Sequence, residues 1–334
     1  MVKYSILIPV YNAQDYIETC LNSVRCQKIT NYEVIVVNDG SQDRSAQICA
    51  AFAERDARFH LISQENRGTL EARKTAIAAA KGEYLLYLDS DDFWEPDTLE
   101  TIDDLIHTWH PDILVFGMRK WYQENKQEEV PTAFESTKVF RGENKKEYVA
   151  AWLQKGWHNA LWRKAIRRNC VDLTDPSYQV ERMVMGEDML LSVYAVHRAD
   201  SILYTDRVLY NYRINDASTV HNFQPKYIQD IHIAFEAMYW MLQVDYPHES
   251  SLRKDFWVSY LESLIDCTAS LFYETSLSKI KTWSDFIVSQ TLFTDMVQSL
   301  TSFTTKQRLI ITLLKCNLPV LSKACAKIWF FFRK

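Results

Sequence analysis

The stretch Tyr84-Leu85-Leu86-Tyr87-Leu88-Asp89-Ser90-Asp91-Asp92 decides the fold of this chain. Residues 84–88 form a continuous apolar and aromatic run of the length that is typical of a buried β-strand. Three of the four residues that follow this run are aspartates. Open α/β sheets bind their ligands at the carboxyl ends of buried strands. In a sheet of that kind, Asp89–Asp92 would lie at the ligand-binding edge.

Two interpretations of these acids are open at this level. Clustered carboxylates repel one another, and a hard divalent cation with oxygen ligands is the usual way to relieve that repulsion. Such a cation could also carry a diphosphate, whose oxygens would complete its coordination. The alternative is a solvated turn whose acids support the N-terminus of the next helix. The local sequence favours neither.

Outward from this stretch, residues 4–118 alternate between strand and helix patterns. The strand patterns are Tyr4–Pro9, Glu33–Asn38, Phe59–Ser63, Glu83–Asp89 and Asp112–Gly117. The helical patterns between them lie at 13–26, 43–56, 68–80 and 97–109. Strands that alternate with helices in this way predict βαβ crossovers. The expected fold class is α/β, with a Rossmann-like, mostly parallel sheet that carries helices on both faces.

The rest of the chain is first polar and then helical. Residues 119–148 are rich in charge and predict an exposed hairpin or a mobile loop. A helical pattern runs from Glu147 to Arg168, a strand pattern covers Ser201–Tyr212, and the chain after residue 225 is wholly helical. The predicted organisation is an α/β domain at 1–222 and a helical C-terminal region at 223–334.

Composition narrows the class of protein. The chain has 334 residues, of which 47% are apolar and 24% charged, as in an ordinary globular protein. Its net charge of −5 argues against nucleic acid as the main partner. Seven scattered cysteines without a CxxC pair predict reduced thiols and no zinc site. With no secretory signal and no apolar run long enough to span a membrane, we expect a cytoplasmic protein.

Two loops follow the first two strand patterns, where a nucleotide would bind. They are Pro9-Val10-Tyr11-Asn12 and Val37-Asn38-Asp39-Gly40-Ser41. Asp39 could accept hydrogen bonds from a base N–H or a ribose hydroxyl, or it could be a turn residue in front of a glycine. The chain contains neither GxGxxG nor GxxxxGK[ST], which argues against a dinucleotide dehydrogenase and a P-loop enzyme.

Five segments together resemble a known family. They are Ile8-Pro9-Val10-Tyr11-Asn12, Val37-Asn38-Asp39-Gly40-Ser41, Asn66-Arg67-Gly68, Ala72-Arg73 and Leu88-Asp89-Ser90-Asp91-Asp92. In order and spacing they resemble the family 2 glycosyltransferases, over residues 4 to about 220. The resemblance implies a GT-A fold and inverting transfer of a sugar from a nucleotide-sugar, with UDP as the expected nucleotide. It also implies Mn²⁺ or Mg²⁺ and a glycan or lipid-linked saccharide acceptor, in bacterial surface polysaccharide synthesis.

The resemblance also implies roles for single residues on the donor side. Asp91 would be the metal ligand, and Asp92 a supporting acid. Arg213 would bind the donor diphosphate, for which the planar guanidinium is suited. The nucleotide or its phosphates would be bound by Pro9, Tyr11, Asn12, Asp39, Asn66, Gly68, Arg73, Asp89 and Ser90.

A second pair of acids, Glu187 and Asp188, matches the Glu-Asp element of the family. Inverting transfer needs a carboxylate that takes the proton of the acceptor hydroxyl. The resemblance makes Asp188 this base and Glu187 the neighbour that positions it or binds acceptor hydroxyls. The local alternative is a pair of acids at a helix N-terminus, and the two interpretations are compatible.

The C-terminal residues 303–334 carry a separate signal. No acidic residue occurs from Met296 to the last residue, Lys334, and basic residues alternate with apolar and aromatic ones such as Trp329 and Phe330–Phe332. A basic amphipathic helix of this kind can lie on an anionic membrane surface. The alternative is a helix that packs on the protein with a solvated basic face. We expect peripheral contact with the inner face of the plasma membrane through 303–334.

Two other functions compete with glycosyl transfer. A non-catalytic partner subunit could keep the fold and bind a nucleotide or glycan, but it would have no use for both Asp91 and Asp188. A sugar-phosphate nucleotidyltransferase should have a glycine-rich N-terminal loop with a basic residue, and Pro9–Asp15 has neither. We therefore expect an enzyme, a metal-dependent glycosyltransferase.

Overall fold

The computed structural model describes most of the chain. The described residues are 2–123, 126–131, 133–155, 159–175, 178–180, 182–214, 224, 226–300 and 303–333. Contacts divide the chain into two compact units. The first comprises Met1–Tyr148 and Trp157–Asn215, and the second comprises Val149–Gly156 and Asp216–Lys334.

The first unit is built on a sheet that has ten strands among the described residues. One half of this sheet is parallel and has the strand order β3-β2-β1-β4. Every residue of β1, β2 and β4 is buried, as expected for parallel strands that are covered on both faces. The bounds are β1 Tyr4–Val10, β2 Tyr32–Asp39, β3 Phe59–Gln64 and β4 Tyr84–Tyr87.

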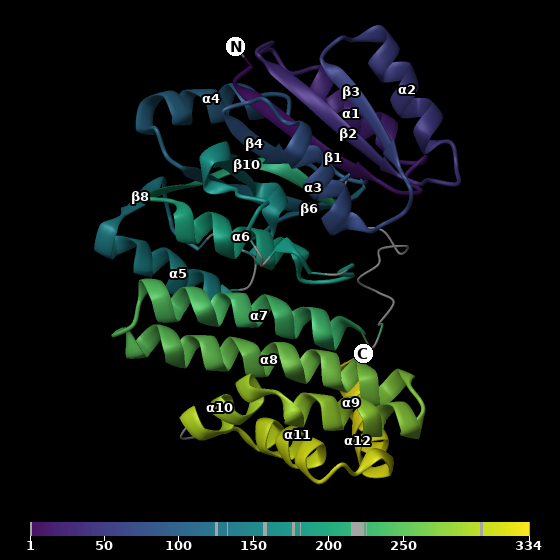
Figure 1. Cartoon of the computed structure of the whole chain (residues 1–334), viewed down its shortest axis with the longest axis vertical. Helices are drawn as coiled ribbons and strands as arrows, with labels where there is room; N and C mark the ends of the chain where they lie inside the picture. The colour runs from purple at the N-terminus through teal and green to yellow at the C-terminus, as the bar shows by residue number, and fades with distance from the viewer. Residues whose placement is uncertain are drawn as a thin grey trace. The chain divides into compact units, whose positions relative to one another are not determined.

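Helices connect and cover these parallel strands. α1 buries Ile17, Cys20, Leu21 and Val24, a spacing that places all four side chains on one face of the helix. Right-handed crossovers place α1 and α2 on one face of the sheet and α3 on the other (Figure 1). The predicted α/β class is confirmed, and the helix bounds are α1 Ile17–Arg25, α2 Ser45–Arg55, α3 Thr69–Ala79, α4 Thr98–Trp109 and α6 Glu187–Arg198.

The other half of the sheet is mixed. Beyond β4 the order continues as β9-β6-β10-β5. β9 runs antiparallel to both of its neighbours, β4 and β6, whereas β6 and β10 are parallel. The alternating pattern of the sequence predicted the parallel part, and the antiparallel insertion at β9 is the difference. The bounds are β5 Phe93–Trp94, β6 Ile113–Gln123, β9 Lys164–Arg167 and β10 Ser201–Arg213.

The helix predicted from Glu147 to Arg168 is wrong in its second half. The observed helix, α5, covers Lys145–Lys155, and β9 follows after a 3₁₀ turn at Leu161–Arg163. Leu, Ala, Arg and Lys favour helices in isolation, so the local sequence looks helical. The tertiary position overrides that preference, because Ala165 and Ile166 are fully buried between β4 and β6.

The polar interval 119–148 holds the hairpin that was one of its two predicted structures. β6 extends to Gln123, and β7, at Lys126–Glu129, pairs with it in antiparallel fashion. All four residues of β7 are exposed. β8, at Lys138–Arg141, then pairs with β10.

The second unit is helical in its described part after residue 225, as predicted. Its core is aromatic: the rings of Phe235, Phe256 and Tyr260 on α7 and α8 lie 5.2–6.3 Å apart. None of the helices, over the residues that the structure describes, is long and apolar enough to cross a membrane. The bounds are α7 Lys226–Asp245, α8 Ser250–Glu274, α9 Leu277–Ser289, α10 Thr291–Ser299, α11 Thr305–Lys315 and α12 Pro319–Arg333.

Candidate active site

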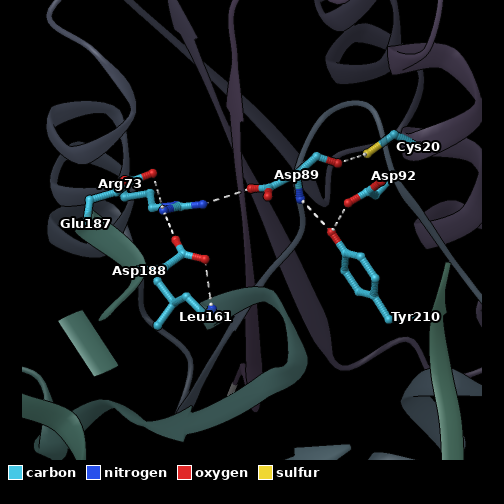
Figure 2. Close-up of polar contacts among 8 residues, drawn as sticks. All are labelled: Cys20, Arg73, Asp89, Asp92, Leu161, Glu187, Asp188 and Tyr210. Carbon is cyan, nitrogen blue, oxygen red and sulfur yellow. Dashed lines mark hydrogen bonds and ion pairs between the residues drawn. The ribbon is translucent and has the colours of Figure 1, made fainter. Parts of the chain in front are cut away.

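The acidic turn after β4 is held by the end of β10. Asp92 is buried, and its carboxylate accepts hydrogen bonds from the hydroxyl of Tyr210 and from the backbone N–H of Arg213, both at 2.7 Å. The Tyr210 oxygen in turn accepts the backbone N–H of Asp89 at 3.2 Å (Figure 2). Burial raises the pKa of Asp92 well above its usual range, and the nearby charges of Asp91 and Asp89 raise it further. Asp92 therefore anchors the turn to the end of β10 and fixes its conformation.

Arg73 on α3 joins the two acidic motifs. Its side chain is only 2% exposed, and Nη2 lies 2.9 Å from Asp89 Oδ1. Its other terminal nitrogen, Nη1, lies 3.2 Å from Glu187 Oε1 and also contacts Asp188 Oδ1 (Figure 2). One guanidinium therefore connects the turn after β4 with the first turn of α6.

The charges in this cluster are unbalanced, because three carboxylates surround one guanidinium. Burial lowers the pKa of Arg73, but Asp188, Asp89 and Glu187 raise it more, so the guanidinium stays charged. Burial raises the pKa of Glu187 to about 7 and that of Asp89 to about 6, although Arg73 opposes both shifts. A further cationic or hydrogen-bonding group from a ligand would therefore be stabilised next to these acids.

Asp188 has both carboxylate oxygens engaged. Oδ1 contacts Arg73, and Oδ2 accepts the backbone N–H of Leu161 at 3.0 Å. α6 begins after Gly186, whose φ of 84° lies in the left-handed region, and both acids stand in the first helical turn. The helix N-terminus favours negative charge there, so the capping interpretation and a chemical role are compatible.

The predicted nucleotide loops lie together around Asp39. This residue is 3% exposed, and its Oδ1 accepts hydrogen bonds from Gln64 Nε2 at 2.8 Å and from the backbone N–H of Arg67 at 2.9 Å. Its Oδ2 accepts the N–H of Gly68 at 2.8 Å. Asp39 therefore organises the loop that leads into α3. The loop after β1 joins this group through Asn12 Oδ1, which accepts the N–H of Gln42 at 2.8 Å.

The backbone at Gly40 lies very close to Asn66. Gly40 has φ 73°, and a Cβ atom there would lie 2.8 Å from the backbone nitrogen of Asn66. Only glycine fits such a close approach without moving the chain. Asn66 Oδ1 is buried and has no hydrogen-bond partner among the described residues. An acceptor oxygen in that state is available to a donor group of a ligand.

Arg213, at the end of β10, lies beside Asp91. Its Nε donates a hydrogen bond to the backbone oxygen of Asp91 at 2.8 Å. Its guanidinium carbon lies 4.6 Å from the ring centre of Trp121 and slightly further from the rings of Phe93 and Tyr16. Aromatic rings around a guanidinium attract its positive charge and fix its plane.

The acidic turn could supply only part of the ligand set of a divalent cation. Asp91 is half-buried, and carboxylate oxygen is the ligand that Mn²⁺ and Mg²⁺ prefer. Within the described ranges, no group of three or more His, Cys, Asp and Glu side chains could hold a metal ion. The residues therefore fit a cation that takes one carboxylate from the protein and most of its oxygens from a bound diphosphate.

The structure thus brings the predicted site residues into three connected groups. The nucleotide loops contain Pro9, Asn12, Asp39, Asn66 and Gly68, and Tyr11 beside them is 51% exposed. The Arg73 cluster contains Asp89, Glu187 and Asp188. The third group contains Ser90 and Asp91 of the turn after β4, with Arg213 of β10 beside them. Sequence reasoning missed the Leu161 N–H, because a backbone donor leaves no side-chain signature. It also missed Gln64 and Trp121, which belong to no motif.

Comparison with solved structures shows the class of fold. TarS residues 1–349 from S. aureus, solved with UDP-GlcNAc, superpose on the whole chain with a TM-score of 0.73 and 19% identity, covering 93% of that chain. The mannosyltransferase PcManGT of Pyrobaculum calidifontis, solved with GDP-Man and Mn²⁺, gives a TM-score of 0.50, 15% identity and coverage of 98% of this chain and 87% of that one. The predicted GT-A fold with a helical C-terminal region is confirmed.

Comparison of sequences shows the family. The model of glycosyl transferase family 2 matches residues 5–170, and this chain belongs to that family. EpsH of Bacillus subtilis, whose name marks it as a candidate glycosyltransferase, is 33% identical over 227 residues, which is 66% of this chain. The chain spans 64% of the length of this curated relative, less than two thirds.

Proposed function

We propose that this protein is an inverting glycosyltransferase that moves one sugar from a nucleotide-sugar to an acceptor hydroxyl. The single observation that carries the proposal is the contact of Arg73 with both Asp89 and Asp188. Asp89 belongs to the donor motif and Asp188 to the acceptor-side motif, so the two halves of a transfer site meet at one guanidinium. Membership in family 2 supports the reaction class.

The donor would bind at the nucleotide loops. Asn66 Oδ1 offers a buried acceptor, and Asp39 and Asn12 already hold the loops in place. Pro9 and Tyr11 would border the base, and Tyr11 has an exposed ring that a base could stack on. We infer UDP as the nucleotide, since TarS, which shares the fold, was solved with UDP-GlcNAc. PcManGT was solved with GDP-Man, so the nucleotide is a point for direct measurement.

Asp188 would act as the base. It takes the proton of the acceptor hydroxyl as that oxygen bonds to the anomeric carbon. The bond from the anomeric carbon to the diphosphate oxygen breaks in the same step, and its electron pair leaves with the diphosphate. Arg73 and the Leu161 N–H hold the side chain of Asp188 in place and fix its direction. Glu187 lies next to it and would bind hydroxyls of the acceptor.

The leaving diphosphate would lie against the turn after β4. Asp91 would hold Mn²⁺ or Mg²⁺, which, when bound, neutralises the charge that develops on the diphosphate. Ser90 and Asp89 would contact the nucleotide, and the guanidinium of Arg213 would hydrogen-bond the phosphate oxygens. The aromatic rings around Arg213 keep this guanidinium in place before the donor arrives.

The acceptor would be a glycan or a lipid-linked saccharide in surface polysaccharide synthesis. We infer a cytoplasmic location, peripheral to the inner face of the plasma membrane, with residues 303–334 as the contact. The basic and apolar composition of this tail supports that location. The proposed domains remain a catalytic domain at 1–222 and a helical region at 223–334.

A second candidate function is a non-catalytic partner subunit that binds a nucleotide or glycan. One observation favours it: both oxygens of Asp188 are engaged within the protein, as in a purely structural carboxylate. It predicts donor binding without turnover. Glycosyl transfer remains the better explanation, because the same two contacts would also orient a base.

The deciding experiment is a screen of nucleotide-sugars for release of nucleoside diphosphate, in Mn²⁺ and in EDTA. We expect one donor to give Mn²⁺-dependent release, which Asp188→Asn abolishes while titration calorimetry still detects donor binding. Binding of a donor to the wild type without any release or transfer would overturn the enzymatic proposal and favour the partner subunit.

A further inference from the structure

The turn between α11 and α12, together with the first turn of α12, exposes large apolar side chains. Leu318, Val320 and Leu321 are 44%, 69% and 50% exposed, and they lie within four residues of one another. Single exposed apolar residues are common, but a contiguous group of large ones marks an interaction surface. These exposed side chains therefore indicate a binding surface for a partner that accepts apolar groups.

A neighbouring turn, between α8 and α9, extends the same surface. Tyr273 and Leu277 are 45% and 43% exposed there. Two hydrogen bonds connect these segments. Lys323 Nζ on α12 donates to the backbone oxygen of Thr275 in the α8–α9 turn. Asn317 Nδ2 in the α11–α12 turn donates to Asp285 Oδ1 of α9 at 2.5 Å. In Figure 1, α9, α11 and α12 lie together in one bundle of yellow and green helices. We call the exposed group the turn surface; it comprises Tyr273, Leu277, Leu318, Val320 and Leu321.

The positive charge around the turn surface indicates which kind of partner it would bind. Residues 273–334 carry nine lysines and arginines against three acidic residues, Glu274, Asp285 and Asp295, although the whole chain has a net charge of −5. Lys279 and Lys281 are exposed near the start of α9, and Lys315 is exposed at the end of α11, so all three lie close to these two turns in the chain. Asp285, one of the two aspartates, is already hydrogen-bonded to Asn317. Apolar side chains surrounded by cations match an anionic lipid bilayer, whose acyl region accepts the first and whose headgroups attract the second.

We propose that the turn surface is a docking site for an anionic lipid bilayer, with Val320 and Leu321 inserted below the headgroups and the lysines above them. A second copy of the chain is a poorer partner, because two surfaces of the same positive charge repel each other. The inference rests on the membrane contact proposed above for residues 303–334 and deepens it, since it adds the α8–α9 turn and assigns the contact to named side chains. It does not depend on the chemistry of the first unit.

The test is co-sedimentation of the full chain with vesicles of phosphatidylcholine alone and of phosphatidylcholine mixed with phosphatidylglycerol. We expect binding to the mixed vesicles and loss of that binding at high salt. The double variant Val320→Glu, Leu321→Glu should weaken binding by about tenfold or more, because insertion of each side chain would be lost. Both residues are exposed in the wild type, so circular dichroism and the melting temperature should stay unchanged.

The matched control is Val244→Glu. Val244 is 53% exposed at the end of α7, next to the start of α8 and therefore a helix length away from the α8–α9 turn. It should bind vesicles like the wild type. Binding that is equal for both lipid mixtures, or equal for the double variant and the wild type, would overturn the proposal. So would a wild-type dimer that the double variant disrupts in the absence of vesicle binding.

The readout separates this inference from the proposed function. Release of nucleoside diphosphate in the absence of lipid should be the same in the double variant and in the wild type. Loss of vesicle binding with intact release supports the docking surface. A chain that binds vesicles through the turn surface but lacks transferase activity would support the inference while refuting the enzymatic proposal.

Discussion

Asp89 and Asp188 are held to opposite ends of one buried guanidinium, that of Arg73. Asp89 follows β4, whereas Asp188 stands in the first turn of α6. The distance between the donor motif and the proposed base is therefore set by the side chain of a residue on a third element, α3. This arrangement makes Arg73 the first target for mutation.

Removing the charge of Arg73 should destabilise the fold. Arg73→Met leaves three partly buried carboxylates without their cation, for which a loss of about 3–5 kcal/mol is typical. The measurement is the urea midpoint and slope of unfolding. Adding Glu187→Gln to Arg73→Met should recover part of the loss, because one repelling charge is removed. A free energy of unfolding within about 1 kcal/mol of the wild type would mean that the ion pairs of the Arg73 cluster contribute little net stabilisation.

Substitution of the proposed base, Asp188, should lower the rate of sugar transfer without lowering donor affinity. Asp188→Asn should lower the rate of sugar transfer by about 10²–10⁴-fold, the range for loss of a general base. Donor affinity, measured by titration calorimetry, should stay close to that of the wild type, since the proposal assigns Asp188 to the acceptor side. Glu187→Gln is the matched control and should cost less activity. A wild-type transfer rate in Asp188→Asn would remove this residue from the mechanism.

Glu187 should make stability depend on pH. Its pKa is raised to about 7 in the folded state, mainly by burial, so the folded protein binds a proton that the unfolded chain releases near the ordinary carboxyl pKa. The stability that this proton provides is complete below about pH 4.5 and is lost as the pH rises to about 7. The wild type should therefore lose stability relative to Glu187→Gln between about pH 5 and about pH 8.

Urea unfolding of both proteins at the two pH values measures this difference. Glu54→Gln, at an exposed position on α2, is the control, and its stability relative to the wild type should change little with pH. A difference between wild type and Glu187→Gln that stays constant over this range would contradict the raised pKa.

Asp91 should carry the metal dependence. Asp91→Ala should lose the Mn²⁺-stimulated part of turnover, about two orders of magnitude or more. Ser90→Ala next to it removes a hydroxyl without removing a carboxylate and should keep its response to Mn²⁺. The measurement is nucleoside diphosphate release against Mn²⁺ concentration. Full Mn²⁺ stimulation in Asp91→Ala would assign the cation to another residue.

Gly40 should be far more sensitive to alanine than Gly142. Both have positive φ, 73° and 53°, so both variants lose the conformational freedom of glycine, at about 1 kcal/mol. A Cβ at Gly142 would meet no atom within 4 Å, whereas at Gly40 it would lie 2.8 Å from Asn66 N. Gly40→Ala should therefore show the larger loss of stability and, unlike Gly142→Ala, a weaker donor affinity. Equal losses would mean that the loop moves aside easily.

Some of this architecture could be predicted from the sequence because the signals are local. The apolar runs of β1, β2 and β4 bury every residue, so their composition alone identifies them. The acids at the ends of strands and helices follow from the order of these elements. β9 could not be predicted, since Lys164–Arg167 consists largely of helix-forming residues and becomes a strand only through its two neighbours.

The residues of the candidate site also divide into those that the sequence predicts and those that only the folded structure reveals. Asp89, Asp91 and Asp188 could be named because acids in motifs are visible in a sequence. The partners of Arg73 could not, because its three contacts involve two elements that are distant in the chain. The Leu161 N–H donor to Asp188 was equally hidden, since any residue type supplies a backbone N–H.

The hydrogen bond from the Gly68 N–H to Asp39 has a consequence for the order in which substrates bind. Gly68 immediately precedes α3, and Arg73 stands little more than one helical turn beyond it. If a nucleotide engages Asp39 as proposed, it acts on the segment that leads into α3, and α3 carries the guanidinium that contacts Asp188. The proposed acceptor side would then be coupled to donor occupancy through α3. Steady-state kinetics of this chain should be sequential and ordered, with the nucleotide-sugar binding first.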